Sequence, residues 1–274
     1  MLFPRSDIQE AVFIWKRSIQ IDYWRKEQLP GEAARLHAAV KSGDLGCVKS
    51  ILFSHAIPPG CRPLLVEHRD ESNWGNTALL QATIRGYLGI VKFLVRDCNA
   101  NVYARDNHEL QSTAAHLASA YGHLDTLSYL LDHYRELVEV KNKNGDTPLN
   151  RAAARGRLSV VQYLVDKKFA NIENRGELGR TPLMMASAWG HAHVVEFLRQ
   201  RGAEVSVRDS ETASTALHLA AYFGHAGVVS HLVERHPDLA QVKNKFGKTP
   251  WTRAKEEQKK NVMNVLRAKC NACE

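Results

Sequence analysis

Apolar positions in this 274-residue chain follow a pattern that recurs about every 34 residues. In each copy, apolar residues lie four, five and eight positions beyond a glycine, as at Val160, Val161 and Leu164. Residues separated by one, three and four positions share one face of an α-helix. The pattern therefore predicts two short helices per copy, joined by a tight turn and followed by a polar connection.

Threonines mark the start of the copies, at intervals of 36, 34, 34, 34 and 34 residues. They are Thr77, Thr113, Thr147, Thr181, Thr215 and Thr249. A threonine hydroxyl caps a helix N-terminus, and Pro148, Pro182 and Pro250 fall at the first helical position, where a missing donor costs nothing. A glycine nine residues after five of the threonines ends the first helix. Units this small must stack to bury an apolar face, so the chain predicts a repeat solenoid.

The T-P-L-x-x-A-A-x-x-G-H core, the period and the V-V-x-x-L second helix resemble ankyrin repeats. Five full copies begin near Ser72, His108, Asn142, Arg175 and Ser210, and a degenerate copy at each end brings the total to seven. The resemblance covers about residues 32–269. It implies an all-α ankyrin-repeat solenoid that binds partners on its concave side. It also implies that histidines hold neighbouring turns together by hydrogen bonds: His37, His116, His123, His191, His218 and His225.

The ends and one insertion depart from the repeat. Residues 1–31 are expected to contain an amphipathic helix over 6–28, with Ile8, Val12, Trp15, Ile19 and Tyr23 on its apolar face and Pro30-Gly31 as its stop. This helix would cover the edge of the first repeat, recruit a partner or, least favoured, lie on a membrane surface. The proline-rich stretch 54–71 is expected to be a non-helical loop, either a tolerated insertion or a binding element. Residues 270–274 form a C-terminal tail.

Composition bears on the cellular compartment and on the class of partner. Five cysteines form no even framework, which favours reduced thiols in the cytoplasm or nucleus. No apolar run reaches about 18 residues, so a membrane span is not expected. The start of the chain also lacks a secretion signal. The net charge of +8 is spread along the chain, which fits either a solvated basic surface or a polyanion footprint.

Candidate chemistry is sparse. Cys270 and Cys273 have the spacing of metal ligands but lack a second pair, so no metal or cofactor is expected. Gln81, Arg151 and Arg253 replace a leucine of the family pattern, which predicts a wetter interior at these places. His108 and His193 lie outside the family's histidine positions and would be the starting points for an atypical enzyme.

Large and charged side chains gather just before the turn glycines and at the loop tips. We expect the partner-binding residues to be Trp74, Asn76, Arg85, Tyr121, Arg155, Arg180, Trp189, Tyr222 and Phe223. Arginine and aromatic residues are enriched in binding hot spots. Alternatively, each aromatic residue packs on the following repeat. The expected function is a monomeric, non-catalytic scaffold or adaptor for a protein or peptide with acidic and apolar residues. A nucleic-acid-binding module is the first alternative, and an enzyme in the concave groove is a weaker one.

Overall fold

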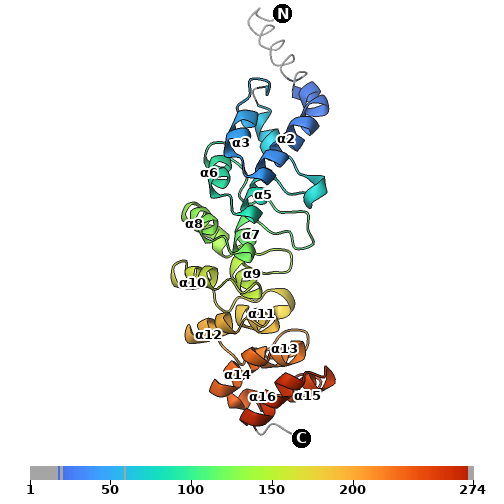
Figure 1. Ribbon diagram of the computed structural model, residues 1–274, viewed down its shortest axis with the longest axis vertical. Helices are drawn as coiled ribbons and strands as arrows, with labels where there is room; N and C mark the ends of the chain where they lie inside the picture. Colours follow the sequence, from blue (N-terminus) through green and yellow to red (C-terminus); the bar gives the residue numbers. More distant parts are fainter. Residues whose placement is uncertain (1–17, 19–20, 59, 271–274) are drawn as a thin grey trace, which may run out of the picture. The chain divides into compact units, whose positions relative to one another are not determined.

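The computed structural model describes residues 18, 21–58 and 60–270, and these are helical wherever they form regular structure apart from one isolated bridge between Asp70 and Asn76 (Figure 1). The chain forms two compact units, the first ending at His108 and the second beginning at Glu109. Unit 1 contains two of the repeated helix pairs and unit 2 contains five. The seven copies and the all-α solenoid fold predicted from the sequence are thereby confirmed.

Unit 1 contains the first two copies and the insertion between them. Its elements are α2 (Leu29–Ser42), α3 (Leu45–Leu52), α4 (Arg62–Val66), the 3-10 turn η1 (Glu71–Asn73), α5 (Ala78–Arg85) and α6 (Leu88–Arg96). The helix pairs are α2/α3 and α5/α6, and α2 packs against α5 within the unit.

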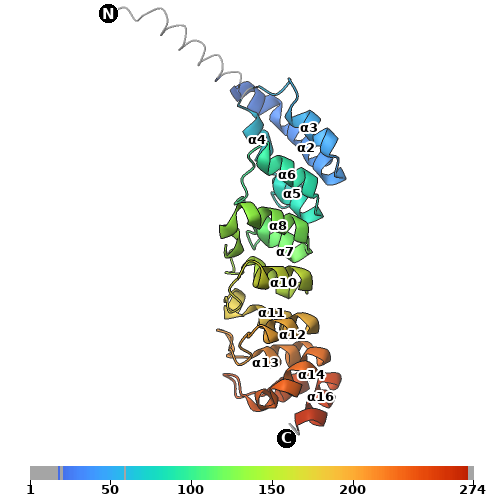
Figure 2. The ribbon, with the colours of Figure 1, turned by 90° about the vertical axis from the view of Figure 1, so that its left-hand side faces the viewer.

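Unit 2 contains the regular copies and the C-terminal one. Its helices are α7 (Ala114–Tyr121), α8 (Leu124–His133), α9 (Pro148–Ala154), α10 (Leu158–Asp166), α11 (Pro182–Ala188), α12 (Ala192–Gln200), α13 (Ala216–Phe223), α14 (Ala226–Arg235), α15 (Pro250–Glu256) and α16 (Lys260–Cys270). Short 3-10 turns lie in its connections: η2 (Arg135–Val138), η3 (Glu177–Gly179) and η4 (Pro237–Gln241). The connecting loops of this unit project to one side of the helices (Figure 2).

The helix boundaries of unit 2 are those that the sequence predicts. Thr181 Oγ1 accepts a hydrogen bond from the Met184 amide at 3.3 Å, and Pro182 begins α11. Gly190 follows that helix in the left-handed conformation, with φ of 80°. In the last copy Gln258 takes the place of the glycine and adopts the same conformation, with φ of 54°. The backbone of the turn is therefore retained where the glycine is absent.

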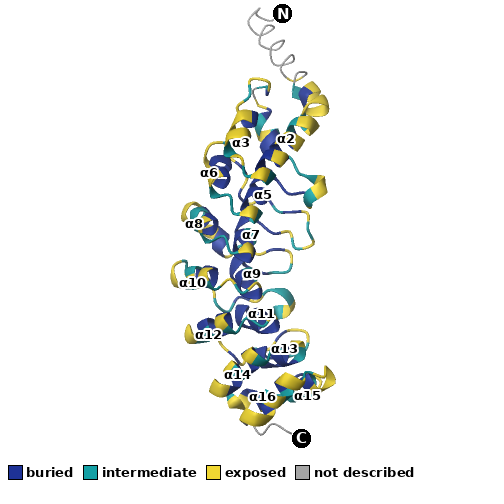
Figure 3. Ribbon diagram, viewed as in Figure 1, coloured by how far each residue is buried: buried dark blue, intermediate teal, exposed yellow. Residues whose placement is uncertain are grey.

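Stacking of the first helices makes the core of unit 2. Helices α7, α9, α11, α13 and α15 pack one on the next in chain order. Small residues such as Ala152, Ala153 and Ala220 are fully buried at these contacts, which allows the helices a close approach. The second helices bury one face, for example Val160, Val161 and Leu164 on α10, and expose the other (Figure 3).

In the N-terminal segment, residues 18 and 21–27 are helical as predicted, but the buried face and the end of the helix differ from the prediction. Residues 1–17, 19 and 20 lie outside the described residues, and so do Ile8, Val12, Trp15 and Ile19. Tyr23 was expected on the apolar face but is exposed, whereas Trp24 is buried. Pro30 does not stop a helix: it lies in the first turn of α2, where its missing N–H leaves no bond unmade.

The insertion 54–71 is a packed element instead of a wholly non-helical loop. Pro63 lies in the first turn of α4, and this helix packs against α2 and α3. Cys61, Leu65 and Val66 are buried. Arg62 donates from Nε to the Leu52 carbonyl at 2.8 Å. Pro63 is therefore compatible with a short helix whose apolar residues extend the core of unit 1.

Candidate partner-binding surface

Four large side chains of unit 2 lie at equivalent points of four consecutive copies. Each immediately precedes a turn glycine at the end of a first helix, and we call this set the turn row: Tyr121, Arg155, Trp189 and Phe223. The three aromatic residues are 50%, 60% and 45% exposed in that order, and Arg155 is exposed as well. Because α7, α9, α11 and α13 pack in chain order, the turn row presents one large side chain per repeat.

The following repeat holds the backbone beneath the turn row. Arg157 Nε donates to the Ala120 carbonyl at 3.0 Å, and the ring of His191 lies with Nε2 at 3.1 Å from the Ala154 carbonyl. His225 Nε2 lies 3.0 Å from the Ala188 carbonyl. These carbonyls belong to the residues directly before the turn-row residues. The expected role of His191 and His225 in joining turns is confirmed.

The turn glycines leave room for the side chains of His191 and His225. A Cβ on Gly156 would lie 2.5 Å from His191 Nδ1, and one on Gly190 would lie 2.5 Å from His225 Nδ1. Both glycines also have positive φ, which glycine adopts without a steric penalty. Burial lowers the pKa of His191. The backbone of these turns is thus held by hydrogen bonds from the next repeat and by close packing against the glycines.

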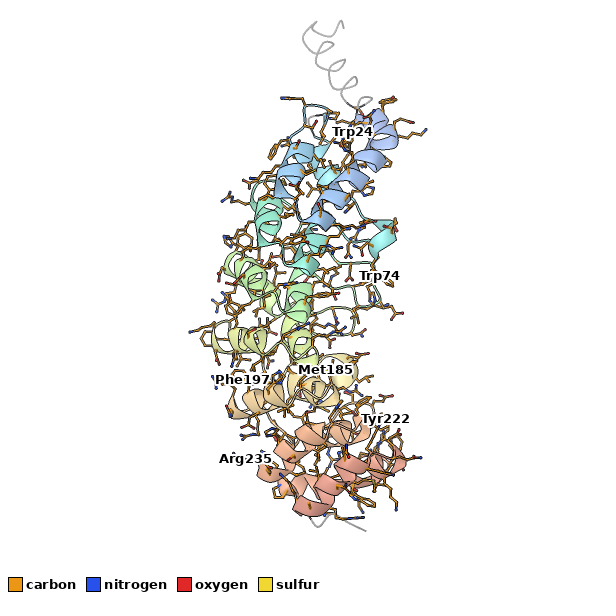
Figure 4. All side chains as sticks on the ribbon, in the orientation of Figure 1. Trp24, Trp74, Met185, Phe197, Tyr222 and Arg235 are labelled. Atoms are coloured by element: carbon orange, nitrogen blue, oxygen red, sulfur yellow. The ribbon has the colours of Figure 1, made fainter. Side chains whose placement is uncertain are left out.

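Tyr222 supports the turn row instead of extending it. Its ring meets that of Phe223 edge to face at 4.9 Å, and the Arg253 guanidinium lies 4.3 Å from its centroid. Tyr222 is half-buried by these neighbours, so the expectation that it packs on the following repeat describes it better than free exposure does. Figure 4 shows Tyr222 on the side of α13 and α15, and Phe197 and Arg235 on the side of α12 and α14.

Arginines near the turn row divide into engaged and available groups. Arg151 approaches the buried Asp146 carboxylate at 3.8 Å, and Arg180 approaches Asp209 at 4.0 Å. Burial raises the pKa of Asp146. Arg180, a predicted partner-binding residue, is therefore directed partly toward the loop of the following repeat. Arg155 is exposed, and it forms no ion pair or side-chain hydrogen bond with any residue that the structure describes.

The polar residues at the leucine position, Gln81 and Arg253, find local partners only in part. Gln81 Nε2 donates to Asp70 Oδ2 at 2.9 Å in unit 1, and Arg253 approaches Glu256 at 3.5 Å in unit 2. The wetter interior that these substitutions predict is present: Gln81 Nε2 and Arg253 meet carboxylates, whereas Gln81 Oε1 is buried without a hydrogen-bond partner among the described residues.

Unit 1 places its three predicted partner-binding residues differently. Trp74 is 65% exposed at a loop tip, in the left-handed conformation with φ of 56°, and its ring meets His108 at 4.8 Å. Arg85 is exposed at the end of α5. Asn76 is only 2% exposed, so its prediction as a surface contact is wrong: it lies where the loop enters α5 and is covered there.

Sequence reasoning missed a buried polar cluster in unit 1. His37 and His68 face each other with ring centroids 5.9 Å apart, close to Asp70, which binds Lys41 at 2.8 Å. Neither ring nitrogen of His37 has a hydrogen-bond partner among the described residues, and burial lowers its pKa. The signal in the sequence was Ala34, because the other copies carry a threonine at this position, and in the two that also have the histidine, Thr113 and Thr215 contact His116 and His218.

The described part of the chain shows no cluster of metal-ligating side chains. Within residues 18, 21–58 and 60–270, no group of three or more histidine, cysteine, aspartate or glutamate side chains is placed to hold a metal ion. His193 Nε2 lies 3.2 Å from the Gly156 carbonyl, and His108 packs on Trp74. The pair Cys270 and Cys273 extends beyond the described residues. No helix among those described is long and apolar enough to span a membrane.

Comparison with known families agrees with this geometry. A family model of ankyrin repeats in three copies matches residues 36–140 and again 134–209. A model of the single ankyrin repeat matches residues 214–245. Together the matches cover well over half of the chain, with the period, caps and turns described above. The chain belongs to the ankyrin-repeat family.

Proposed function

We propose that this protein is a non-catalytic interaction module that binds another protein or a peptide through the turn row of unit 2. Ankyrin repeats are generally protein–protein interaction modules. The observation that carries the proposal is the exposure of Tyr121, Trp189 and Phe223 together with the available guanidinium of Arg155. Exposed large apolar side chains that form a set usually have a use, and these residue types dominate binding hot spots.

Rigidity supports the same conclusion. Three of the four turn-row residues, Tyr121, Arg155 and Trp189, lie at helix ends held by hydrogen bonds from Arg157, His191 and His225 of the following repeats. Binding to a surface that is already ordered loses less conformational entropy than binding to a mobile loop. A partner would therefore meet a preorganised series of side chains.

Charge placement favours a protein partner over nucleic acid. Many basic groups of unit 2 are engaged within the unit. Arg175 donates to the Arg208 carbonyl, Arg208 donates to the Lys243 carbonyl, and Arg201 pairs with Asp166. A nucleic-acid site needs several free cations along one path, whereas the turn row offers one arginine among three aromatic residues. Acidic and apolar groups of a protein partner match this composition.

A double substitution tests the proposal. Tyr121→Ala with Trp189→Ala should weaken binding of the partner by more than tenfold, about 1.4 kcal/mol. The melting temperature should change little because both rings are exposed. Phe169→Ala is the matched control, since Phe169 is an exposed aromatic residue of unit 2 outside the turn row. The partner would be obtained by affinity capture on the full chain and its dissociation constant measured for each variant.

Two results would count against the proposal. One is equal loss of binding in the double variant and in Phe169→Ala, which would remove any special role of the turn row. The other is a fall in affinity of about 10³-fold or more between 50 and 200 mM salt, which indicates a polyanion partner.

A further inference from the structure

The turn row has a regular spacing along unit 2. Tyr121, Arg155, Trp189 and Phe223 follow one another at 34-residue intervals on first helices that pack in order. Packed helices lie about 8–10 Å apart. The three steps from Tyr121 to Phe223 therefore span about 24–30 Å, with one large side chain at each step.

We propose that the turn row accepts a polyproline II segment of the partner that places an anchoring side chain on it at every third residue. This inference rests on the proposed function and specifies the conformation and sequence pattern of the partner. A polyproline II helix has three residues per turn and a rise of about 3.1 Å, so residues i, i+3, i+6 and i+9 share one face about 9.3 Å apart. Three such steps cover about 28 Å, within the span of the turn row.

Other regular conformations fit the spacing less well. A β-strand repeats its side-chain direction every two residues, which gives same-face steps of about 6.6 Å or about 13 Å. An α-helix returns to the same face after seven residues, or about 10.5 Å, so three steps reach about 31 Å and drift by about 20° per step. Both mismatches accumulate over four repeats.

The chemistry of each position gives the pattern. The rings of Tyr121, Trp189 and Phe223 are open to apolar side chains, and aromatic-lined surfaces are the usual receptors of proline-rich polyproline II segments. Arg155 is available for a carboxylate, which a guanidinium binds through two parallel hydrogen bonds. The partner pattern is therefore apolar-x-x-acidic-x-x-apolar-x-x-apolar, or its reverse, with proline favoured at the intervening positions.

Selection from a random peptide library tests this pattern. Displayed peptides of about 12 residues are long enough for four anchors at three-residue spacing. They would be selected on the full chain and counter-screened on Arg155→Glu and on the Tyr121→Ala, Trp189→Ala double variant. We expect enriched peptides whose binding depends on the turn row and whose acidic residue is three residues from one apolar residue and three and six from two others.

Synthetic peptides then measure the spacing and the charge. Insertion of one residue between the acidic position and the next apolar position should weaken binding at least tenfold, although all anchoring side chains are kept. Arg155→Glu should cause a similar loss, and replacing the acidic residue of the peptide by lysine should restore binding to that variant.

The outcomes separate this inference from the proposed function. Peptides that need the turn row for binding but have a two-residue, a seven-residue or no periodicity would overturn the inference alone. Equal binding of the peptides with and without the inserted residue would do the same. Recovery of no row-dependent peptide would also overturn it, whereas the partner measurement on the double variant still decides the proposed function. Tight binders that are indifferent to both turn-row variants, together with an unchanged affinity of the partner, would reject both.

Discussion

Acidification should destabilise unit 2 through one buried histidine, His218. Its Nδ1 accepts a hydrogen bond from the Thr215 amide at 3.3 Å and lies 2.9 Å from the Thr215 hydroxyl. Its Nε2 lies 3.0 Å from the Lys248 carbonyl of the next repeat. These contacts require a neutral ring with its proton on Nε2, because a protonated Nδ1 cannot accept. Burial lowers the pKa of His218 to about 4.

The size of the effect follows from linkage. In the unfolded chain the imidazole keeps a pKa near its ordinary value of 6.5. Between pH 6.5 and 4 the unfolded state binds a proton that the folded state does not, so stability falls as the pH falls. A difference of about 2.5 pH units at about 1.4 kcal/mol per unit gives about 3–4 kcal/mol. This contribution is fully present above the unfolded pKa and is lost progressively down to about pH 4.

The chain itself offers a matched control. Asn150 occupies the same position in another repeat: its Oδ1 accepts from the Thr147 amide at 3.2 Å and its Nδ2 donates to the Arg180 carbonyl at 3.4 Å. His218→Asn should therefore keep both contacts without titrating. Urea unfolding between pH 7 and 4 should show the wild type losing up to about 3–4 kcal/mol more than this variant. All other titrating groups are common to the two proteins, so parallel curves would refute the reasoning.

Two further substitutions test the packing of each unit. Gly190→Ala should lower the free energy of unfolding of unit 2 by at least about 1–2 kcal/mol, because the backbone there has a positive φ and the new Cβ meets the ring of His225. Gly227→Ala is the control, since a Cβ there has nothing within 4 Å. Equal urea midpoints of the two variants would contradict the role of the turn glycine. Trp24→Ala should destabilise unit 1 by about 3 kcal/mol because the ring is buried. Hydrogen exchange along α2 should become faster in this variant but not in Tyr23→Ala. Unchanged protection of α2 would show that Trp24 does not stabilise this helix.

The local signals in the sequence were sufficient for the repeat architecture. Thr181 with Pro182 begins a helix through its own hydroxyl and ring, and Gly190 ends it by taking a positive φ. These effects act within a few residues, so they can be read without knowledge of the neighbours. The stacking of copies follows because a single copy cannot bury its apolar face.

The candidate surface was predictable only in part. Tyr121, Trp189 and Phe223 are exposed at the turns where the sequence placed them. Whether each ring was free or packed on the next repeat depended on the residue that the next repeat presents. Arg253 lies over the ring of Tyr222, whereas Trp189 remains 60% exposed.

Tertiary structure alone decided the features that depend on distant neighbours. The sequence by itself determined the number of copies, their helix boundaries and the positions of the turn glycines. It did not determine that Asn76 is covered, that residues 62–66 form a helix, or that His37 faces His68. The physical reason is that burial and hydrogen bonding of a side chain are set by surfaces brought together from other repeats, and the insertion 54–71 changed those surfaces in unit 1 alone.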